Sequence, residues 1–216
     1  MHISEGVLSA PVLATGAVLA VVGVAVGLKR LDEERIPRAA LLAAAFFVAS
    51  LIHVPIGPSS AHLILNGLVG LLLGWAAFPA ILVALILQGV LFGFGGITTL
   101  GVNTIIMAAP AVACHHLFGR TIHRRRAAAL AGAFACGFLS VLLGGMIAAL
   151  ALALTEAAFF EVAAALVLAH LPVMAIEGIV TAGCVDFLRR VQPELLGGAL
   201  PDGAEVAALR EHPAGR

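Results

Sequence analysis

Residues 124–154 read RRRAAALAGAFACGFLSVLLGGMIAALALAL: three arginines are followed by 28 residues that carry no charge. About 20 apolar residues are enough to cross the hydrocarbon core of a bilayer as an α-helix. The rest of the chain is similar, since 62% of its 216 residues are hydrophobic, 11% are charged and the mean hydropathy is +1.11. This composition excludes an ordinary soluble domain and predicts a single bundle embedded in a membrane.

Seven apolar stretches predict an all-α integral membrane protein with about seven transmembrane helices. The expected helices are 7–28, 39–54, 61–75, 80–92, 97–118, 127–154 and 159–188. Residues 1–190 would form this one bundle, and 191–216 a short polar cytoplasmic tail. The stretches 61–75 and 80–92 are short for a bilayer, so six helices with one re-entrant segment are the alternative.

The positive charges lie on one side of this topology. All twelve Lys and Arg residues fall in 29–38, in 120–126 or after 188. Lys and Arg accumulate on the cytoplasmic side of membrane proteins. We therefore expect the N-terminus outside, the C-terminus in the cytoplasm and the protein in the bacterial inner membrane. The net charge of zero gives no indication of a nucleic-acid partner.

Met1 and His2 would then lie on the outer face, with Met1 expected to be the mature start. The free amine, the His2 amide nitrogen and the His2 imidazole can close fused five- and six-membered chelate rings around one cation. Ni²⁺, Cu²⁺ and, less readily, Co²⁺ can displace the amide proton, whereas Mg²⁺ and Ca²⁺ prefer oxygen ligands. A fourth nitrogen would complete a square-planar site.

His62 is the candidate fourth ligand. It is expected two residues into a short helix at the outer rim, and His53 is expected near the outer end of the preceding helix. An imidazole in a membrane segment is costly unless it is paired or functional. Each histidine alone is more often a hydrogen-bonded polar residue. Two of them near a His-bearing terminus favour a transition-metal site.

His170 and Glu177 are seven residues apart on the expected last helix and therefore share a face. A buried carboxylate needs a partner, and His170 or a polar group such as Asn103 could serve. The pair could simply pack two helices together, or it could relay protons or support metal ligands. Asn66, Gln88 and Asn103 are expected as interhelical hydrogen-bonding residues.

The chain contains four distinctive segments: MHISEG at 1–6, HVPIGPSSAHL at 53–63, FGFGGITTLGVN at 92–103, and His170-Leu-Pro through Glu177-Gly178 with RVQPE at 190–194. Together they resemble the motifs of the CbiM/NikM family, the substrate-capturing S components of energy-coupling-factor (ECF) transporters for cobalt and nickel. The resemblance spans about residues 1–195. One departure is Ser60-Ala61, which stands where Gly or another small residue often precedes the histidine, and it should alter packing more than ligation.

The resemblance implies a seven-helix fold and a site of four nitrogens: the Met1 amine, the His2 amide and imidazole, and the His62 imidazole. Ni²⁺ or Co²⁺ would be the transported substrate, with no organic cofactor. His53 would support these ligands or replace one of them, and Asn103, His170 and Glu177 are further candidates for a supporting role. The implied partners are a transmembrane T component, cytoplasmic ABC ATPases and a small auxiliary membrane subunit, in a system linked to cobalamin biosynthesis.

Small residues at four-residue spacing predict close helix packing on the first two helices. The pairs are Ala10/Ala14, Gly16/Ala20, Gly23/Gly27, Ala39/Ala43 and Ala40/Ala44. These faces could pack inside the bundle or dock onto the T component.

Two other functions are alternatives to metal capture for an importer. One is a stand-alone secondary carrier in which His170 and Glu177 couple protons to metal movement. The other is a membrane enzyme with a metal cofactor. The enzyme is disfavoured because the four-nitrogen set leaves no open position and no base or nucleophile stands beside it. The residues do not decide between nickel and cobalt.

Overall fold

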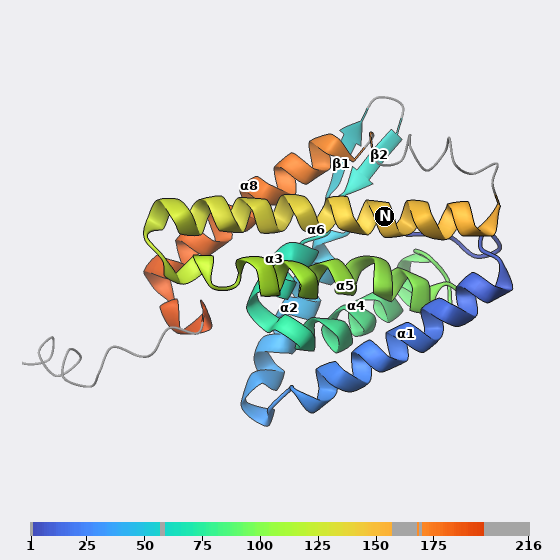
Figure 1. Ribbon diagram of the computed structural model, residues 1–216, viewed down its shortest axis with the longest axis horizontal. Helices are drawn as coiled ribbons and strands as arrows, with labels where there is room; N and C mark the ends of the chain where they lie inside the picture. Colours follow the sequence, from blue (N-terminus) through green and yellow to red (C-terminus); the bar gives the residue numbers. More distant parts are fainter. Residues whose placement is uncertain (1, 57–58, 157–167, 169, 197–216) are drawn as a thin grey trace, which may run out of the picture.

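The protein is a helical bundle in its computed structural model, which describes residues 2–56, 59–156, 168 and 170–196 (Figure 1). Helix α5 runs alongside α6, α1 packs against α5, and α8 packs against α6. The short helix α3 is buried among α2, α5, α6 and α8. The helices are α1 (Ala10–Lys29), α2 (Ile36–Ala49), α3 (Asn66–Leu73), α4 (Ala77–Phe92), α5 (Leu100–Phe118), α6 (Arg126–Thr155) and α8 (Leu171–Val191).

Proline and glycine set several helix ends. Pro11, Pro37 and Pro172 stand in the first turns of α1, α2 and α8, where no N–H is needed and the fixed φ suits a helix. Helix α4 ends at Phe92 and is followed by Gly93, whose φ of 68° is the left-handed conformation that commonly terminates a helix. Between α3 and α4 the chain bends at Gly74 and passes through one 3₁₀ turn, Gly74–Ala76.

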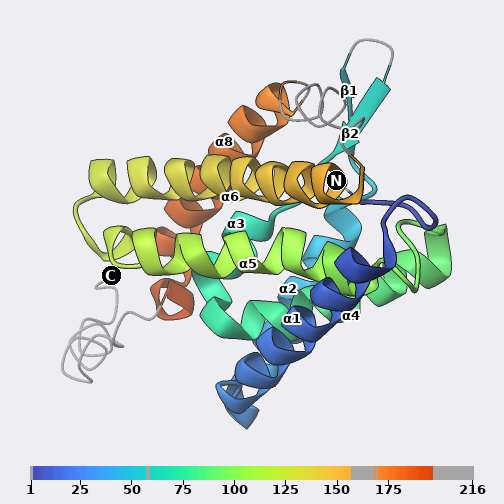
Figure 2. The same ribbon diagram turned by 45° about the vertical axis from the view of Figure 1, so that its right-hand side comes forward.

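The expected helices 39–54 and 61–75 are wrong in part, because a β-hairpin lies between them. Helix α2 ends at Ala49, and strands β1 (His53–Ile56) and β2 (Ser59–His62) pair in antiparallel register. Proline within a run ends a helix and holds the preceding residue in an extended conformation, and this segment contains Pro55 and Pro58. The hairpin stands at the end of the bundle near the start of α8 (Figure 2).

The number of membrane crossings is not settled by helix length. In the described part of the chain, five helical stretches are long and apolar enough to cross a membrane: α1, Asn66–Phe92, α5, α6 and α8. Helix α2 has 14 residues, and most of the first half of the expected helix 159–188 lies outside the described residues. The described chain is therefore a multi-pass membrane bundle, and the seventh crossing stays a prediction.

Basic residues gather at one end of the bundle. Arg126, at the start of α6, forms a two-point ion pair with Asp186 of α8 at 2.7 and 2.9 Å, and Arg190 bonds the same carboxylate at 2.8 Å. Arg189 donates to the main-chain oxygen of Ile122 in the connection between α5 and α6. The N-terminal segment lies at the other end of α6, where the Ser9 amide donates to Thr155 Oγ1 at 3.3 Å.

Most of the small-residue pairs pack inside the bundle. Gly16, Ala20, Gly23 and Gly27 of α1 are all buried, as are Ala39 and Ala43 of α2. A Cβ on Gly16 would lie 2.3 Å from Val102 Cγ2, so α1 and α5 could not approach as they do with a larger residue there. Ala10, Ala14, Ala40 and Ala44 remain exposed on the described bundle.

Candidate metal centre

Two histidines far apart in the sequence meet in the part of the bundle that holds the N-terminal segment, away from the basic end. His2 belongs to the N-terminal segment, and His62 is the last residue of strand β2 rather than part of a helix. His62 Nε2 lies 3.1 Å from His2 Nδ1, and the two ring centroids are 4.9 Å apart. The sequence predicted both residues for one site, and the structure brings them together.

The other nitrogen of each ring is held by a hydrogen-bond acceptor. His2 Nε2 lies 2.8 Å from Gln88 Oε1, and His62 Nδ1 lies 3.0 Å from the main-chain oxygen of Leu63. An acceptor at these positions favours the tautomer that carries its proton there. A metal ion between the rings could then accept lone pairs from both His2 Nδ1 and His62 Nε2, whereas without a metal their 3.1 Å contact is a hydrogen bond in which one of the two nitrogens donates.

The separation of these two nitrogens suits neighbouring ligands of one metal ion. Imidazole nitrogens bind first-row metals at about 2.0–2.1 Å, so two nitrogens 3.1 Å apart would subtend roughly 100° at a shared ion. A square-planar site requires angles near a right angle between adjacent ligands. The pair therefore fits two adjacent corners of such a site.

The His2 ring is neutral at physiological pH. Burial lowers the pKa of its imidazole to about 4, because the charged form is poorly solvated inside the bundle. The hydrogen bond with Gln88 acts in the opposite direction but does not reverse the shift. A neutral ring keeps a lone pair for a metal ion without first losing a proton to the solvent.

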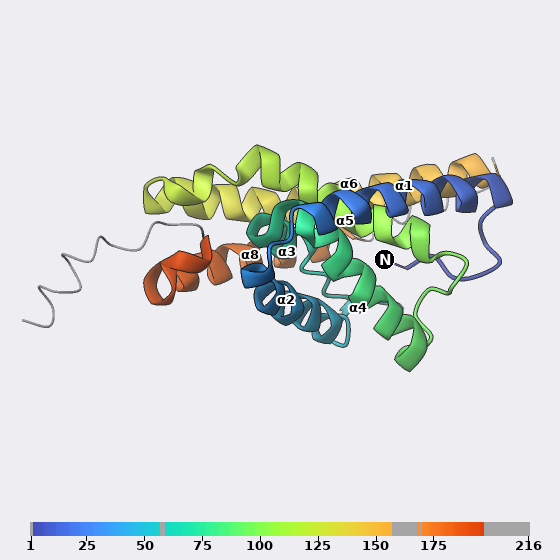
Figure 3. The same cartoon turned by 90° about the horizontal axis from the view of Figure 1, so that it is seen from below.

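Asn103 of α5 fixes the main chain that follows His2. The Ile3 amide donates to Asn103 Oδ1 at 2.9 Å, and Asn103 Nδ2 donates to the Ile3 oxygen at 3.0 Å. Seen from below, the N-terminal segment accordingly runs inward beside α5 and α4 (Figure 3). Because the Asn103 side chain pairs with both polar groups of Ile3, it positions the backbone of the predicted ligand segment.

The glycine-rich segment Gly93–Gly96, which precedes α5, forms a rim beside His2. Gly95 adopts a φ of 77°, and a Cβ there would lie 2.8 Å from Asn103 Nδ2. The Phe94 ring centroid lies 5.8 Å from that of His2. Glu5 joins this segment to the N-terminus, since its Oε1 accepts from the Thr98 amide at 3.1 Å.

The structure describes the other residues predicted for the site only in part. His53 pairs with His62 in the hairpin register, but its side chain lies outside the described part of the structure, as does the whole of Met1. His170 is buried immediately before α8. Glu177 accepts hydrogen bonds from the main-chain amides of Ile64 and Leu65, whereas Asn103 bonds Ile3 instead.

Gln88 is the site residue whose role the sequence did not reveal. It was expected only as an interhelical hydrogen-bonding residue, yet it is fully buried and bonds His2. Its position near the C-terminal end of the apolar helix α4, a few residues before the Gly93–Gly96 rim, was the available signal. No group of three His, Cys, Asp or Glu side chains gathers anywhere among the described residues.

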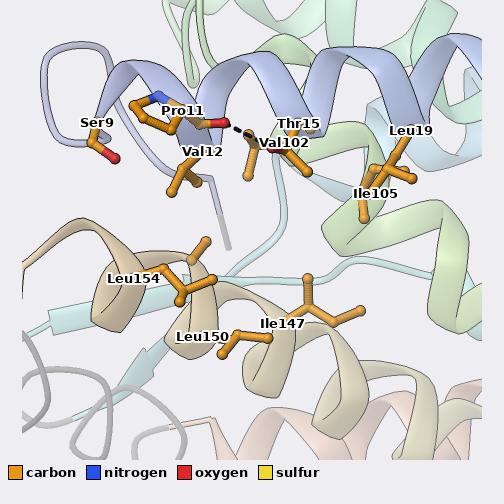
Figure 4. A pocket seen from close by; sticks show the side chains of 12 residues that line it. Ser9, Pro11, Val12, Thr15, Leu19, Val102, Ile105, Ile147, Leu150 and Leu154 are labelled. Carbon is orange, nitrogen blue, oxygen red and sulfur yellow. Dashed lines mark hydrogen bonds between the residues drawn. The ribbon is translucent and has the colours of Figure 1, made fainter.

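An apolar groove of about 430 Å³ between α1, α5 and α6 is a separate feature (Figure 4). Val12 and Leu19 of α1 line one wall, and Ile147 and Leu150 of α6 line the other. The groove contains none of the candidate ligands, and its apolar walls suit hydrocarbon rather than a cation.

Comparison with known proteins supports metal transport. The profile of a family described as the cobalt uptake substrate-specific transmembrane region matches residues 2–195. A protein of Haemophilus influenzae named for metal transport is 47% identical over 199 residues, which cover 91% of this chain and 97% of that protein. The fused nickel transport protein NikMN of Rhodobacter capsulatus is 35% identical over 237 residues, covering 97% and 68%. A crystal structure of a transition metal transporter superimposes with a TM-score of 0.76 at 29% identity, covering 88% of this chain and 93% of that one.

Proposed function

The chain belongs to the cobalt-uptake substrate-specific transmembrane family, CbiM, and from this membership we propose that it captures Ni²⁺ or Co²⁺ at the outer face for an ECF-type importer. It is a multi-pass membrane transport protein of the cobalt and nickel class and not an enzyme. The ion is its substrate. The proposal concerns the ligand set, the direction of transport and the partners.

One observation carries the proposed site: the inward nitrogens of His2 and His62 face each other while their outward nitrogens are held by acceptors. A cation placed between the rings would accept both lone pairs. The hydrogen-bonded outer nitrogens would keep the rings in the ligating orientation, as is usual for metal-binding histidines.

The ring nitrogen that His2 presents also fits the proposed chelate. Only Nδ1 can close a six-membered ring through Cγ, Cβ, Cα and the His2 amide nitrogen. Nδ1 is the nitrogen that faces His62, whereas Nε2 is held by Gln88. The Met1 amine would close the adjacent five-membered ring, so the four ligands would be the Met1 amine, the His2 amide, His2 Nδ1 and His62 Nε2.

Main-chain nitrogen ligands also agree with the small number of ligating side chains. Where side chains are described, no third His, Cys, Asp or Glu joins His2 and His62. A deprotonated amide suits Ni²⁺, and divalent ions bind such nitrogen sites in the order Co²⁺ below Ni²⁺. We therefore expect both metals to bind, with Ni²⁺ the tighter.

The direction of transport follows from the two ends of the bundle. The basic end, with Arg126 and Arg190, would face the cytoplasm according to the positive-inside rule. The histidine pair lies toward the opposite end, beside the N-terminal segment. Release into the cell would then require a change of state driven by a T component and ABC ATPases. Association with further transport components agrees with the fused form of the nickel transport relative.

The test is nickel and cobalt calorimetry on two versions of the protein, one with Met1 as its free terminus and one extended by two residues before Met1. The extension keeps every side chain and removes only the amine from its position. We expect binding to collapse in the extended protein. Full binding by the extended protein would show that side chains alone bind the metal, and a stand-alone carrier would then be tested by uptake without partner ATPases.

A further inference from the structure

Glu177 is a fully buried carboxylate bonded entirely to main chain among the described residues. Its Oε1 accepts from the amides of Ile64 and Leu65, at 2.9 Å for Leu65, and its Oε2 lies 3.0 Å from the Leu65 amide. No Lys or Arg of the described chain forms an ion pair with it. A carboxylate in a membrane bundle is retained at a cost, which makes a functional role the first hypothesis.

The amide of Ile64 belongs to the same peptide group as the carbonyl of Leu63. That carbonyl oxygen lies 3.0 Å from His62 Nδ1. A continuous chain of hydrogen bonds therefore runs from the Glu177 carboxylate, through the Leu63–Ile64 peptide, to the outer nitrogen of the His62 ring. The inner nitrogen of that ring faces His2.

We propose that Glu177 positions and strengthens His62 as a metal ligand through the Leu63–Ile64 peptide, a role that rests on the proposed metal site. A carboxylate that accepts from an N–H polarises the peptide and makes its carbonyl a stronger acceptor, since hydrogen bonds in a chain reinforce one another. The carbonyl then holds the proton on Nδ1 and increases electron density at Nε2. Metal-binding histidines commonly obtain this effect from a carboxylate directly, and here one peptide group stands between the two.

The backbone geometry at this corner depends on the same carboxylate. Leu65 has a φ of 61°, a left-handed conformation that is unfavourable for leucine, and it directly precedes α3. Amides at a helix start have no acceptor within the helix. By accepting from Ile64 and Leu65, Glu177 stabilises the turn that separates the ligand strand β2 from α3.

The test compares Glu177→Gln with Asp186→Asn on the same helix. The first substitution would keep the shape of the side chain but remove its charge, whereas Asp186 bonds Arg126 and Arg190 at the basic end. Calorimetry should show nickel affinity reduced about 10- to 100-fold in Glu177→Gln, the range found for outer partners of metal ligands, and unchanged in Asp186→Asn. The nickel absorption band of Glu177→Gln should also shift, which a loss of stability alone would not cause.

Equal nickel affinity in Glu177→Gln and the wild type, or an equal loss in Asp186→Asn, would overturn the proposal. Should Glu177→Gln fail to fold, the metal-free wild type still decides, with ¹⁵N-labelled histidine and NMR, and His62→Ala to assign the signal. We expect His62 Nδ1 to carry a proton, and an Nδ1 without a proton would overturn the relay. A wild type that shows this tautomer but binds no nickel would refute the metal site and leave the hydrogen-bond chain intact.

Discussion

His2 Nδ1 and His62 Nε2 lie 3.1 Å apart although 60 positions separate the two residues in the chain. Each comes from an irregular or extended segment rather than from a transmembrane helix. Three helices each contribute one side chain that hydrogen-bonds these segments: Gln88 from α4, Asn103 from α5 and Glu177 from α8. The site is thus assembled at the end of the bundle from short segments whose main chain is fixed by buried polar side chains.

Replacing His62 by alanine should weaken nickel binding more than loss of a supporting residue does. Outer partners of metal ligands typically contribute 10- to 100-fold, so the loss of a direct ligand should exceed about 100-fold. Calorimetry would measure it. The matched control is His116→Ala, which removes an exposed imidazole from α5 near the basic end. Comparable losses in the two variants would contradict the role of His62.

Gln88→Leu should weaken nickel binding without lowering the stability of the metal-free protein. It removes the acceptor for His2 Nε2, so the His2 ring could rotate or change tautomer, and nickel affinity should fall about tenfold or more. Gln88 Nε2 has no hydrogen-bond partner among the described residues, so leucine would also remove an unsatisfied buried group. The melting temperature of the metal-free protein should therefore not decrease. A large decrease together with weaker binding would indicate a purely structural residue.

Asn103→Leu should release the N-terminal segment. Both main-chain groups of Ile3 lose their partner, and an unsatisfied buried polar group costs about 1–3 kcal/mol. The segment should escape this cost by leaving the bundle, so hydrogen exchange at Ile3 should increase and nickel affinity should fall. Protection of the Ile3 amide equal to that in the wild type would show that Asn103 does not hold this segment.

The sequence was sufficient to predict the membrane bundle and the proximity of His2 and His62, but not the hairpin and the hydrogen bonds that position these two residues. Apolar runs predict α1, α5 and α6 because burial in lipid requires apolar helices, and the basic connections predict which side of the membrane each end faces. The hairpin was missed because four-residue strands leave almost no periodicity in so apolar a chain. Gln88 was expected only as an interhelical hydrogen-bonding residue, and Glu177 was singled out without its main-chain partners. Their partners, His2 and the Ile64 amide, become neighbours only when separate segments pack together.

Gly95→Ala and Gly93→Ala test whether the rim beside His2 acts on the metal site. Both glycines have positive φ, 77° and 68°, so alanine should cost about 1–2 kcal/mol of backbone strain at either position. Only at Gly95 would the new Cβ meet a site residue, at 2.8 Å from Asn103 Nδ2, whereas nothing lies within 4 Å at Gly93. The melting temperatures should therefore fall in both variants, while calorimetry should show weaker nickel binding in Gly95→Ala alone. Equal nickel affinities in the two variants would show that displacing the Asn103 amide does not disturb the metal ligands. Asn103 could then contribute to binding only through its hydrogen bonds to Ile3.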